Sequence, residues 1–329
     1  MYARIWTIAS LFVAMSGLSG PVVAATSAPP PKGAEKIIID TDIGDDIDDA
    51  FAIALALRSP ELDILGISTA YGDTAGRATI VDRMLGETGR ASIPVAVGIG
   101  TPIDPALAGF TMNQRRYGSG GHFGRSSHPQ AVEFILEQIR RYPGEITLVT
   151  IGPLTNIGAL IDRSPDTFRK LKRVVVMGGS FEAIKDDYGN AKPLEPMAEW
   201  NIRLDIGAAQ KLFRSGVPLY VMPLDSTIHL LLDEVKRNAI FSHGTPNTDA
   251  LTLLYHQWAG SVRVTPTLFD AMTIAYILNP ELCPVQPMNV HVDDKGFTRV
   301  ESGTPNAQVC LHSDSEAFFR FYMSKLLAR

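Results

Sequence analysis

The stretch IIIDTDIGDDIDDA, residues 37–50, decides the fold of this chain. Its three isoleucines predict a short buried strand, because β-branched residues pack well on a pleated surface. Six aspartates follow within ten residues, and carboxylates this close together raise one another's pKa values. A bound cation relieves the repulsion, and a ligand set made only of oxygen suits a hard cation. The stretch therefore predicts a metal site at the carboxyl end of a strand, where open α/β sheets bind their ligands.

Strand-like and helix-like segments alternate along the rest of the chain. Such alternation predicts an α/β fold, with one open, mostly parallel sheet and helices on both faces. We expect strands at 37–39, 64–70, 93–97, 146–151, 174–177 and 219–222, and edge strands at 288–292 and 307–311. We expect helices at 50–58, 74–87, 128–141, 154–161, 206–215, 232–241, 249–261, 270–278 and 315–327. The two long loops are expected at 98–127 and 178–198.

The N-terminus has the pattern of a secretory signal. Residues 1–25 combine an early arginine, an apolar stretch and small residues at the end. We expect this segment to be removed, although an uncleaved anchor is an alternative. Residues 26–35 form a Pro-rich linker and residues 36–329 a single domain. The expected location is therefore secreted or periplasmic, with no membrane contact after cleavage.

Composition narrows the class of protein further. The chain has 329 residues, 45% hydrophobic and 20% charged, as in soluble globular proteins. Its formal net charge is −5 and no basic run is present, so nucleic acid is not an expected partner. The two cysteines, Cys283 and Cys310, either pair in an oxidising compartment or remain buried free thiols.

The acidic cluster has three interpretations. It can bind calcium, with Asp42 at the strand end and Asp46 or Asp49 at the start of the next helix. It can supply the nucleophile of a phosphatase, with Asp40 and Asp42 forming an Asp-x-Asp motif. It can also be a solvated acidic cap without a metal.

Two further segments add polar groups suited to a sugar. Glu199 and Asn201 lie two residues apart, so in an extended segment both face one side. A carboxylate beside an amide suits sugar hydroxyls, although a helix-capping pair looks similar. Asp270 opens an apolar helix, and by itself it favours an ordinary N-cap.

With these residues in place, the chain resembles the nucleoside hydrolase family, which cleaves the N-glycosidic bond of ribonucleosides. The resemblance rests on four motifs in the family's order: IIDTDIG with DDA (38–50), IGPLTNI (151–157), VMGG (176–179) and MAEWN (197–201). It extends from about residue 36 to near the C-terminus. It implies a single α/β domain, one calcium ion at the bottom of a pocket, and a homo-oligomer, either a dimer or a tetramer.

The resemblance also implies roles for individual residues. Asp42 resembles the general base. The implied calcium ligands are Asp42, Asp49, the backbone carbonyl of Ile151, and Asp270. The implied substrate contacts are Asp46, Asp73, Asn190, Glu199 and Asn201. Two extra residues stand between the glycine and the aspartate pair, so Asp48 is an alternative to Asp46 on the sugar.

The chain departs from the family at the residue that would protonate the leaving nucleobase. Phe269 stands where the best-studied members carry a histidine that protonates the base. His122, in a Gly-rich loop, is our candidate for this role at the substrate, and His256 and Tyr255 on a later helix are the alternatives. The predicted function is calcium-dependent hydrolysis of a small nucleoside into base and ribose. The alternative is a non-catalytic nucleoside- or sugar-binding protein on the same fold.

Overall fold

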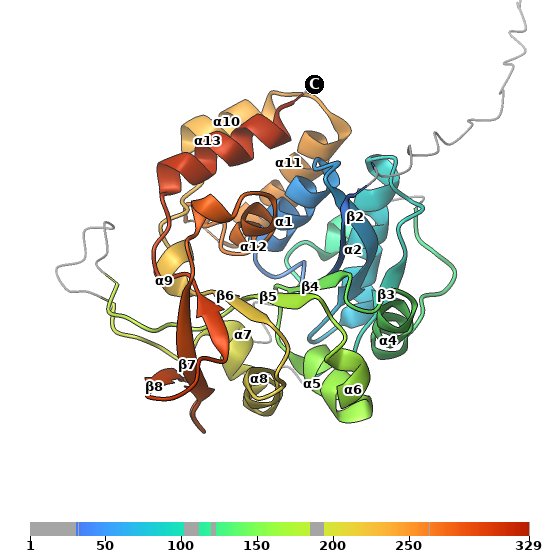
Figure 1. Cartoon of the computed structure of the whole chain (residues 1–329). Coiled ribbons are helices and arrows are strands. Elements are labelled where there is room, and N and C mark those ends of the chain that lie inside the picture. Colours follow the sequence, from blue (N-terminus) through green and yellow to red (C-terminus); the bar gives the residue numbers. More distant parts are fainter. Residues whose placement is uncertain are drawn as a thin grey trace, which may run out of the picture.

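A nine-stranded sheet forms the centre of the computed structural model, which describes residues 31, 33–101, 112–119, 123–184, 194–262 and 264–328 (Figure 1). The strand order is β3-β2-β1-β4-β5-β6-β9-β7-β8. The strands are β1 (Glu35–Thr41), β2 (Leu62–Thr69), β3 (Val95–Val97), β4 (Ile146–Thr150), β5 (Arg173–Met177), β6 (Leu219–Met222), β7 (Gln286–Val292), β8 (Thr298–Glu301) and β9 (Ala307–Val309). Every pairing from β3 to β9 is parallel, whereas β7 pairs antiparallel with β9 and β8. The predicted open, mostly parallel sheet is confirmed.

The isoleucines of β1 show how the sheet is held between two layers of helices. Ile37 and Ile39 face one hydrophobic core, and Ile38 faces the other, because side chains alternate along a strand. All three are fully buried. This burial on both faces explains why the predicted strand reads as a continuous apolar run.

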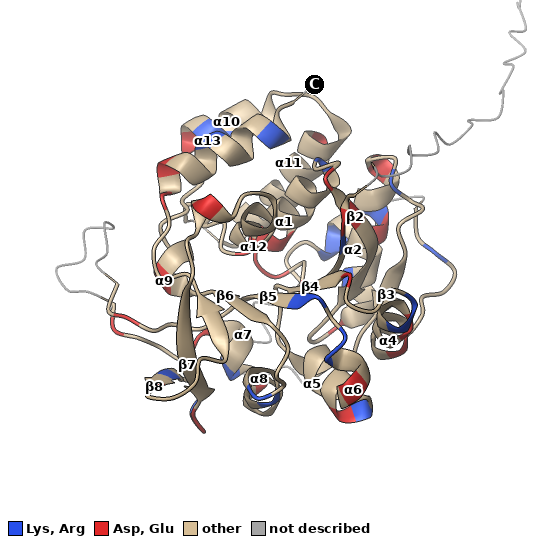
Figure 2. Ribbon diagram, in the orientation of Figure 1, with Lys and Arg blue, Asp and Glu red and all other residues tan. Residues whose placement is uncertain are grey.

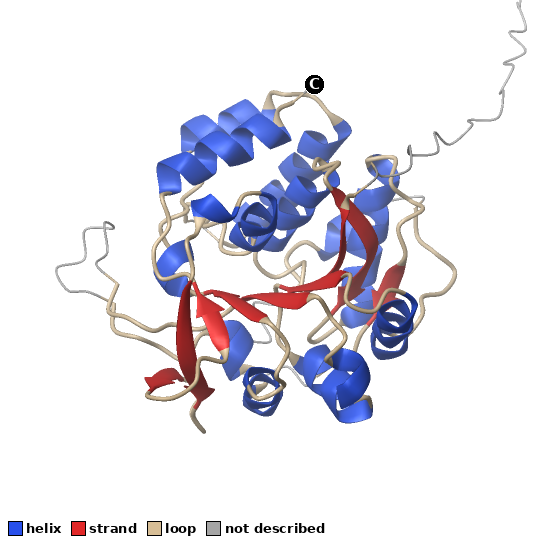
Figure 3. Cartoon of the chain, viewed as in Figure 1, coloured by secondary structure: helices blue, strands red, loops and turns tan. Residues whose placement is uncertain are grey.

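The two helix layers lie on opposite faces of the sheet (Figures 1 and 3). The first layer packs on Ile37 and Ile39, and contains α1 (Asp48–Leu57), α2 (Thr74–Glu87), α10 (Glu234–Phe241), α11 (Pro246–Ala259), α12 (Ala271–Leu278) and α13 (Ser315–Leu326). The second layer packs on Ile38, and contains α4 (Ala131–Arg141), α5 (Thr155–Arg163), α6 (Pro165–Phe168) and α8 (Ile206–Phe213). Short helices complete the chain: α3 (Arg115–Ser119), α7 (Trp200–Arg203), α9 (Leu224–Thr227) and the 3-10 turn η2 (Pro280–Leu282).

Two helices begin earlier than expected, and one strand was not expected. Helix α11 begins at Pro246, because Thr245 and Thr248 form a reciprocal capping box one turn earlier than expected. Helix α1 begins at Asp48 and all ten of its residues are buried. Strand β8 was not expected, since most of its side chains are exposed and carry no apolar alternation.

Cys283 and Cys310 form a disulfide, with their Cα atoms 5.6 Å apart. The bond joins the end of η2 to the residue after β9, which resolves the two alternatives for these cysteines. Within the described ranges, no helix is long and apolar enough to span a bilayer. The predicted signal segment, and all of the linker up to residue 30, lie outside the described residues.

Candidate active site

A cavity of about 690 Å³ opens at the carboxyl ends of the central strands. Asp42 follows β1, Ile151 follows β4, Met177 ends β5, and Leu224 lies just after β6, and all four line the cavity. This is the expected edge of the sheet for ligand binding. The volume is in the range of pockets that enclose a small molecule.

Three buried carboxylates meet at the cavity from distant parts of the sequence. Asp48 and Asp49 begin α1, and Asp270 stands directly before α12. One ligand atom from each lies within 4.8 Å of the others. The three side chains are at most 5% exposed. Figure 2 shows the acidic residues of this region near the centre of the molecule.

Local hydrogen bonds fix the orientation of the cluster. The Thr41 hydroxyl at the end of β1 donates to Asp49 Oδ1. The backbone N–H of Asp270 donates to Asp48 Oδ2 at 3.3 Å, which ties α12 to α1. Asp42 lines the same cavity but is not one of these three acids; Gly152 packs against it so closely that a Cβ there would stand 2.9 Å from Asp42 Oδ1. The carboxylates are therefore held together by the fold.

Electrostatics of the cluster favour a bound cation. Burial raises the pKa of Asp42 to about 7. Burial, and then the neighbouring carboxylates, raise the pKa values of Asp48, Asp49 and Asp270 well above their usual range. A divalent cation would allow these groups to ionise together. The donor set, buried and made of oxygen only, fits a hard cation such as calcium.

Glu199 and Asn201 line the same cavity at the start of α7. Glu199 is the N-cap of α7, and its carboxylate accepts from the N–H groups of Asn201, Ile202 and Gly179. Asn201 Nδ2 donates to the carbonyl of Met177 at 3.2 Å. The pair thus both caps a helix and presents polar groups to the cavity, so the two interpretations of this motif hold together.

Large apolar side chains form another part of the lining. They are Met177, Met197, Trp200, Leu224, Trp258, Val262 and Phe269. Aromatic rings in this wall offer flat surfaces for a planar ligand. Trp258 and Asn113 were not among our sequence candidates. Trp258 lies three residues before the end of an expected helix, and only its aromatic side chain indicated a role.

Some predicted site residues lie elsewhere or outside the described ranges. Asp46 lines the cavity with an exposed side chain, whereas its alternative Asp48 is buried in the cluster. Asp73 does not line the cavity, because its carboxylate caps α2 through the N–H of Gly76 and pairs with Arg115. His122 and Asn190 lie outside the described residues.

Asp40 is placed where it cannot act as a nucleophile. Its side chain is fully buried, is absent from the cavity lining, and accepts hydrogen bonds from Ser68 and Asn156. This placement argues against the phosphatase interpretation, which needs an accessible carboxylate in that position.

Comparisons with known proteins converge on one family. The family model described as inosine-uridine preferring nucleoside hydrolase matches residues 37–320. The chain is 32% identical over 316 residues to a pyrimidine-specific ribonucleoside hydrolase, RihA, of Citrobacter koseri, covering 88% of this chain and 97% of the relative. It is 36% identical over 208 residues to uridine nucleosidase 1 of Arabidopsis thaliana, covering 61% and 59%.

Solved structures agree with this result. The plant nucleoside hydrolase PpNRh1 superposes with a TM-score of 0.75 at 26% identity, covering 90% of this chain and 100% of the other. A purine-preferring ribonucleoside hydrolase from Gardnerella vaginalis gives a TM-score of 0.74 at 23% identity, covering 89% and 98%. At that identity, the second match supports the fold alone.

Proposed function

Because the chain belongs to the inosine-uridine preferring nucleoside hydrolase family, and is thus a ribonucleoside N-hydrolase, we propose that it is a calcium-dependent enzyme acting on pyrimidine ribonucleosides. The observation that carries the metal requirement is the cluster of three buried carboxylates at the cavity. The pyrimidine preference rests on the bacterial and plant relatives, which are described as acting on pyrimidines or uridine.

The proposed calcium ligands are the carboxylates of Asp42, Asp49 and Asp270, and the backbone carbonyl of Ile151. All four residues line the cavity. Asp48, which lies within the same cluster, is proposed as a neighbour of the ion or of the sugar. When bound, a calcium ion supplies positive charge that orients and acidifies a water molecule.

Asp42 is the proposed general base. It accepts a proton from the attacking water while the new C–O bond forms at the anomeric carbon. The bond between the anomeric carbon and the nucleobase nitrogen breaks, and its electron pair leaves with the nucleobase. Without a metal, burial raises the pKa of Asp42 to about 7. A bound cation would lower that pKa and keep Asp42 as a carboxylate, which is the form that accepts a proton.

The sugar and the base are held by different parts of the cavity. Glu199 and Asn201 are proposed to bind ribose hydroxyls, with Asp46 close to the opening. Positive charge develops on the sugar ring, as in glycoside cleavage generally, and the carboxylates of Glu199 and Asp46 would stabilise it. Trp200, Trp258 and Phe269 provide surfaces on which a planar base can stack.

Phe269 cannot donate a proton to the departing base. His122 stays our proposed acid, as a prediction from the sequence. Asp73 and Asn190 also stay sequence-based proposals for sugar contacts, and the capping role of Asp73 makes it the less direct of the two.

We also propose that the protein acts outside the cytoplasm, either secreted or periplasmic. The N-terminal pattern predicts export, and the Cys283–Cys310 disulfide supports it because such bonds persist in oxidising compartments. The resemblance favours a dimer or a tetramer, and light scattering of the purified protein tests this directly.

The function is tested with purified protein lacking residues 1–25. Uridine, cytidine and inosine are incubated with excess calcium or with EDTA, and free base is measured by chromatography. We expect release of uracil and cytosine faster than hypoxanthine, and loss of all three activities in EDTA that added calcium restores. Full activity after metal removal would contradict the calcium requirement, and binding of uridine without release of base would contradict hydrolysis.

A further inference from the structure

Arg77 is a fully buried arginine next to the acidic loop. It lies in the first turn of α2, and its side chain is 0% exposed. Arginine is rarely buried completely, since a buried charge needs paired charges and hydrogen bonds. The guanidinium group of Arg77 must therefore be paired and hydrogen-bonded within the protein.

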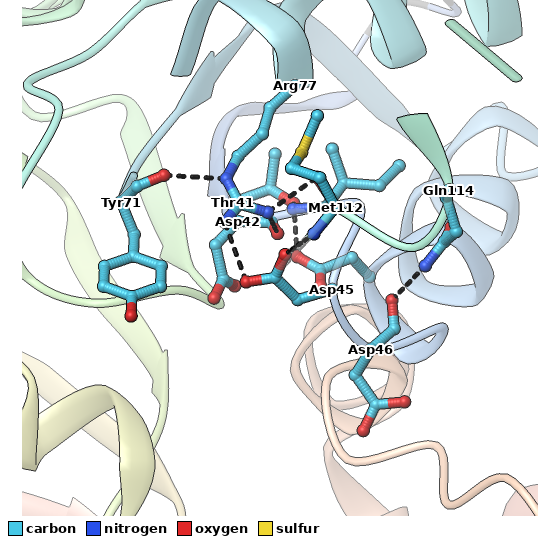
Figure 4. A network of polar contacts seen from close by, with 10 residues as sticks. Thr41, Asp42, Asp45, Asp46, Tyr71, Arg77, Met112 and Gln114 are labelled. Atoms are coloured by element: carbon cyan, nitrogen blue, oxygen red, sulfur yellow. Dashed lines mark hydrogen bonds and ion pairs between the residues drawn. The ribbon is translucent and has the colours of Figure 1, made fainter. Parts of the chain in front are cut away.

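The guanidinium group of Arg77 bonds to two separate segments (Figure 4). Nε donates to the carbonyl of Tyr71, just after β2, at 2.7 Å. Nη1 donates to the carbonyls of Asp42 and Ile43, the second at 3.0 Å. Nη2 pairs with Asp45 Oδ2 at 2.8 Å. One side chain thus holds the backbone of the proposed general base.

Asp45 extends this connection to a third segment. Its other oxygen, Oδ1, accepts from the backbone N–H of Met112 at 2.5 Å. The backbone N–H of Gln114 donates to the carbonyl of Gly44 at 3.2 Å. Gly44 has a φ of +122°, and a Cβ there would meet Met112 Sδ at 3.0 Å, so the close docking needs glycine. Asn113, between the two anchored residues, lines the cavity.

Tyr71 connects Arg77 to the aromatic part of the cavity. Its φ of 65° is uncommon for a residue with a side chain, and the bond from Arg77 Nε holds its carbonyl. The Tyr71 ring meets the Trp200 ring edge to face, with centroids 6.4 Å apart. Trp200 lines the cavity.

We propose that Arg77 is a positioning residue, which fixes three segments around one cavity: Asp42, residues 112–114, and Tyr71. Asp42 and Asn113 line that cavity directly, and the Tyr71 ring contacts Trp200, which also lines it. The proposal rests on the proposed function, because it assigns Arg77 to the geometry of the calcium and base sites. The role needs directional bonds as well as charge. A guanidinium offers five donors in a planar fork, whereas a lysine ammonium is a compact point charge on a flexible stem.

The test compares Arg77→Lys and Arg77→Met with Arg83→Met in the purified enzyme. Arg83 is a matched control on the same helix. It donates to the carbonyl of Tyr117 at 2.8 Å, pairs with Glu87 within α2, and does not line the cavity. The readouts are calcium affinity, from calorimetric titration with calcium chloride, and kcat and KM for uridine.

We expect both Arg77 variants to bind calcium about 10–100-fold more weakly and to lose kcat, as for other residues that orient metal ligands. Arg83→Met should keep both constants within about threefold of the wild type. Wild-type calcium affinity in Arg77→Lys, or an equal loss in Arg83→Met, would overturn the proposal. A wild-type enzyme that neither binds calcium nor releases uracil would instead overturn the proposed function.

A double variant separates positioning from charge balance. Arg77→Met leaves Asp45 without its buried partner and can destabilise the fold, whereas Arg77→Met with Asp45→Asn removes both charges. We expect the double variant to regain thermal stability and to keep the weak calcium affinity. Recovery of wild-type calcium affinity would show that Arg77 supplies only charge compensation, and the positioning role would be wrong.

Discussion

Asp42→Asn and Asp40→Asn form a pair of identical changes two positions apart. Asp42 lines the cavity, and burial raises its pKa to about 7. Asp40 is fully buried away from the cavity and accepts from Ser68 Oγ and Asn156 Nδ2. Asparagine has the shape of aspartate but cannot take a proton from water.

The size of the effect follows from these roles. Loss of a general base commonly costs about 10²–10⁴-fold in rate, or about 3–5 kcal/mol in activation free energy. We expect Asp42→Asn to lower kcat for uridine by that amount at saturating calcium. Asparagine at position 40 keeps an acceptor oxygen for Ser68 and Asn156, so we expect less than about a threefold change.

The assay measures reducing sugar released from uridine at saturating substrate and neutral pH. Calcium affinity is measured in parallel, so that loss of metal can be distinguished from loss of the base. The reverse order of severity, with Asp40→Asn inactive and Asp42→Asn active, would refute the assignment. It would also revive the phosphatase interpretation.

Burial by itself raises the pKa of Glu35, but hydrogen bonds from Thr147 and Arg173 outweigh burial, so the pKa lies below its ordinary value of 4.5. The ionised Glu35 therefore stabilises the fold above about pH 4.5, and this contribution is lost as the pH falls through the lower pKa of the folded state. Glu35→Gln should have a lower Tm than the wild type at neutral pH, and this difference should shrink on acidification. A difference in Tm that grows on acidification would contradict this. Replacing both Cys283 and Cys310 by Ser opens a loop with a sequence separation of 27, and should lower the free energy of unfolding by about 3–4 kcal/mol in urea titrations; an unchanged midpoint would be against it. Phe269→His should speed hydrolysis of inosine more than that of p-nitrophenyl riboside, whose leaving group needs no acid, and an equal effect on both would exclude a role as acid.

Most of the fold could be predicted because its strands are apolar and its helices carry clear periodicity. The run 37–39 is buried on both faces, and burial on both faces is what a short β-branched run indicates. Strand β8 was missed, since three of its four residues are exposed and its partner β7 alone determines its pairing. The disulfide could not be decided, because a separation of 27 residues says nothing about distance in space.

The polar residues of the candidate site could be predicted from motifs, but the register of the acidic cluster could not. Asp42, Asp49, Glu199 and Asn201 stand in motifs, and the structure brings all of them to one cavity. Which aspartates of residues 45–49 enter the cluster could not be decided from the sequence. Asp48 is buried against Asp270 at the start of α12, 222 residues away along the chain.

Arg77 was also out of reach of the sequence. In the sequence, nothing distinguishes Arg77 from an arginine that forms an ordinary ion pair with an acid. Its importance depends on hydrogen bonds to Tyr71, Asp42 and Asp45, which no local pattern encodes.

The central claim is that a divalent cation, held by acids from distant parts of the chain, makes this cavity reactive. A crystal structure of the protein grown with saturating calcium, with anomalous scattering used to locate the ion, tests this most directly. We predict one calcium ion in contact with Asp42, Asp49 and Asp270. Clear density for these side chains, with no ion between them at saturating calcium, would contradict it.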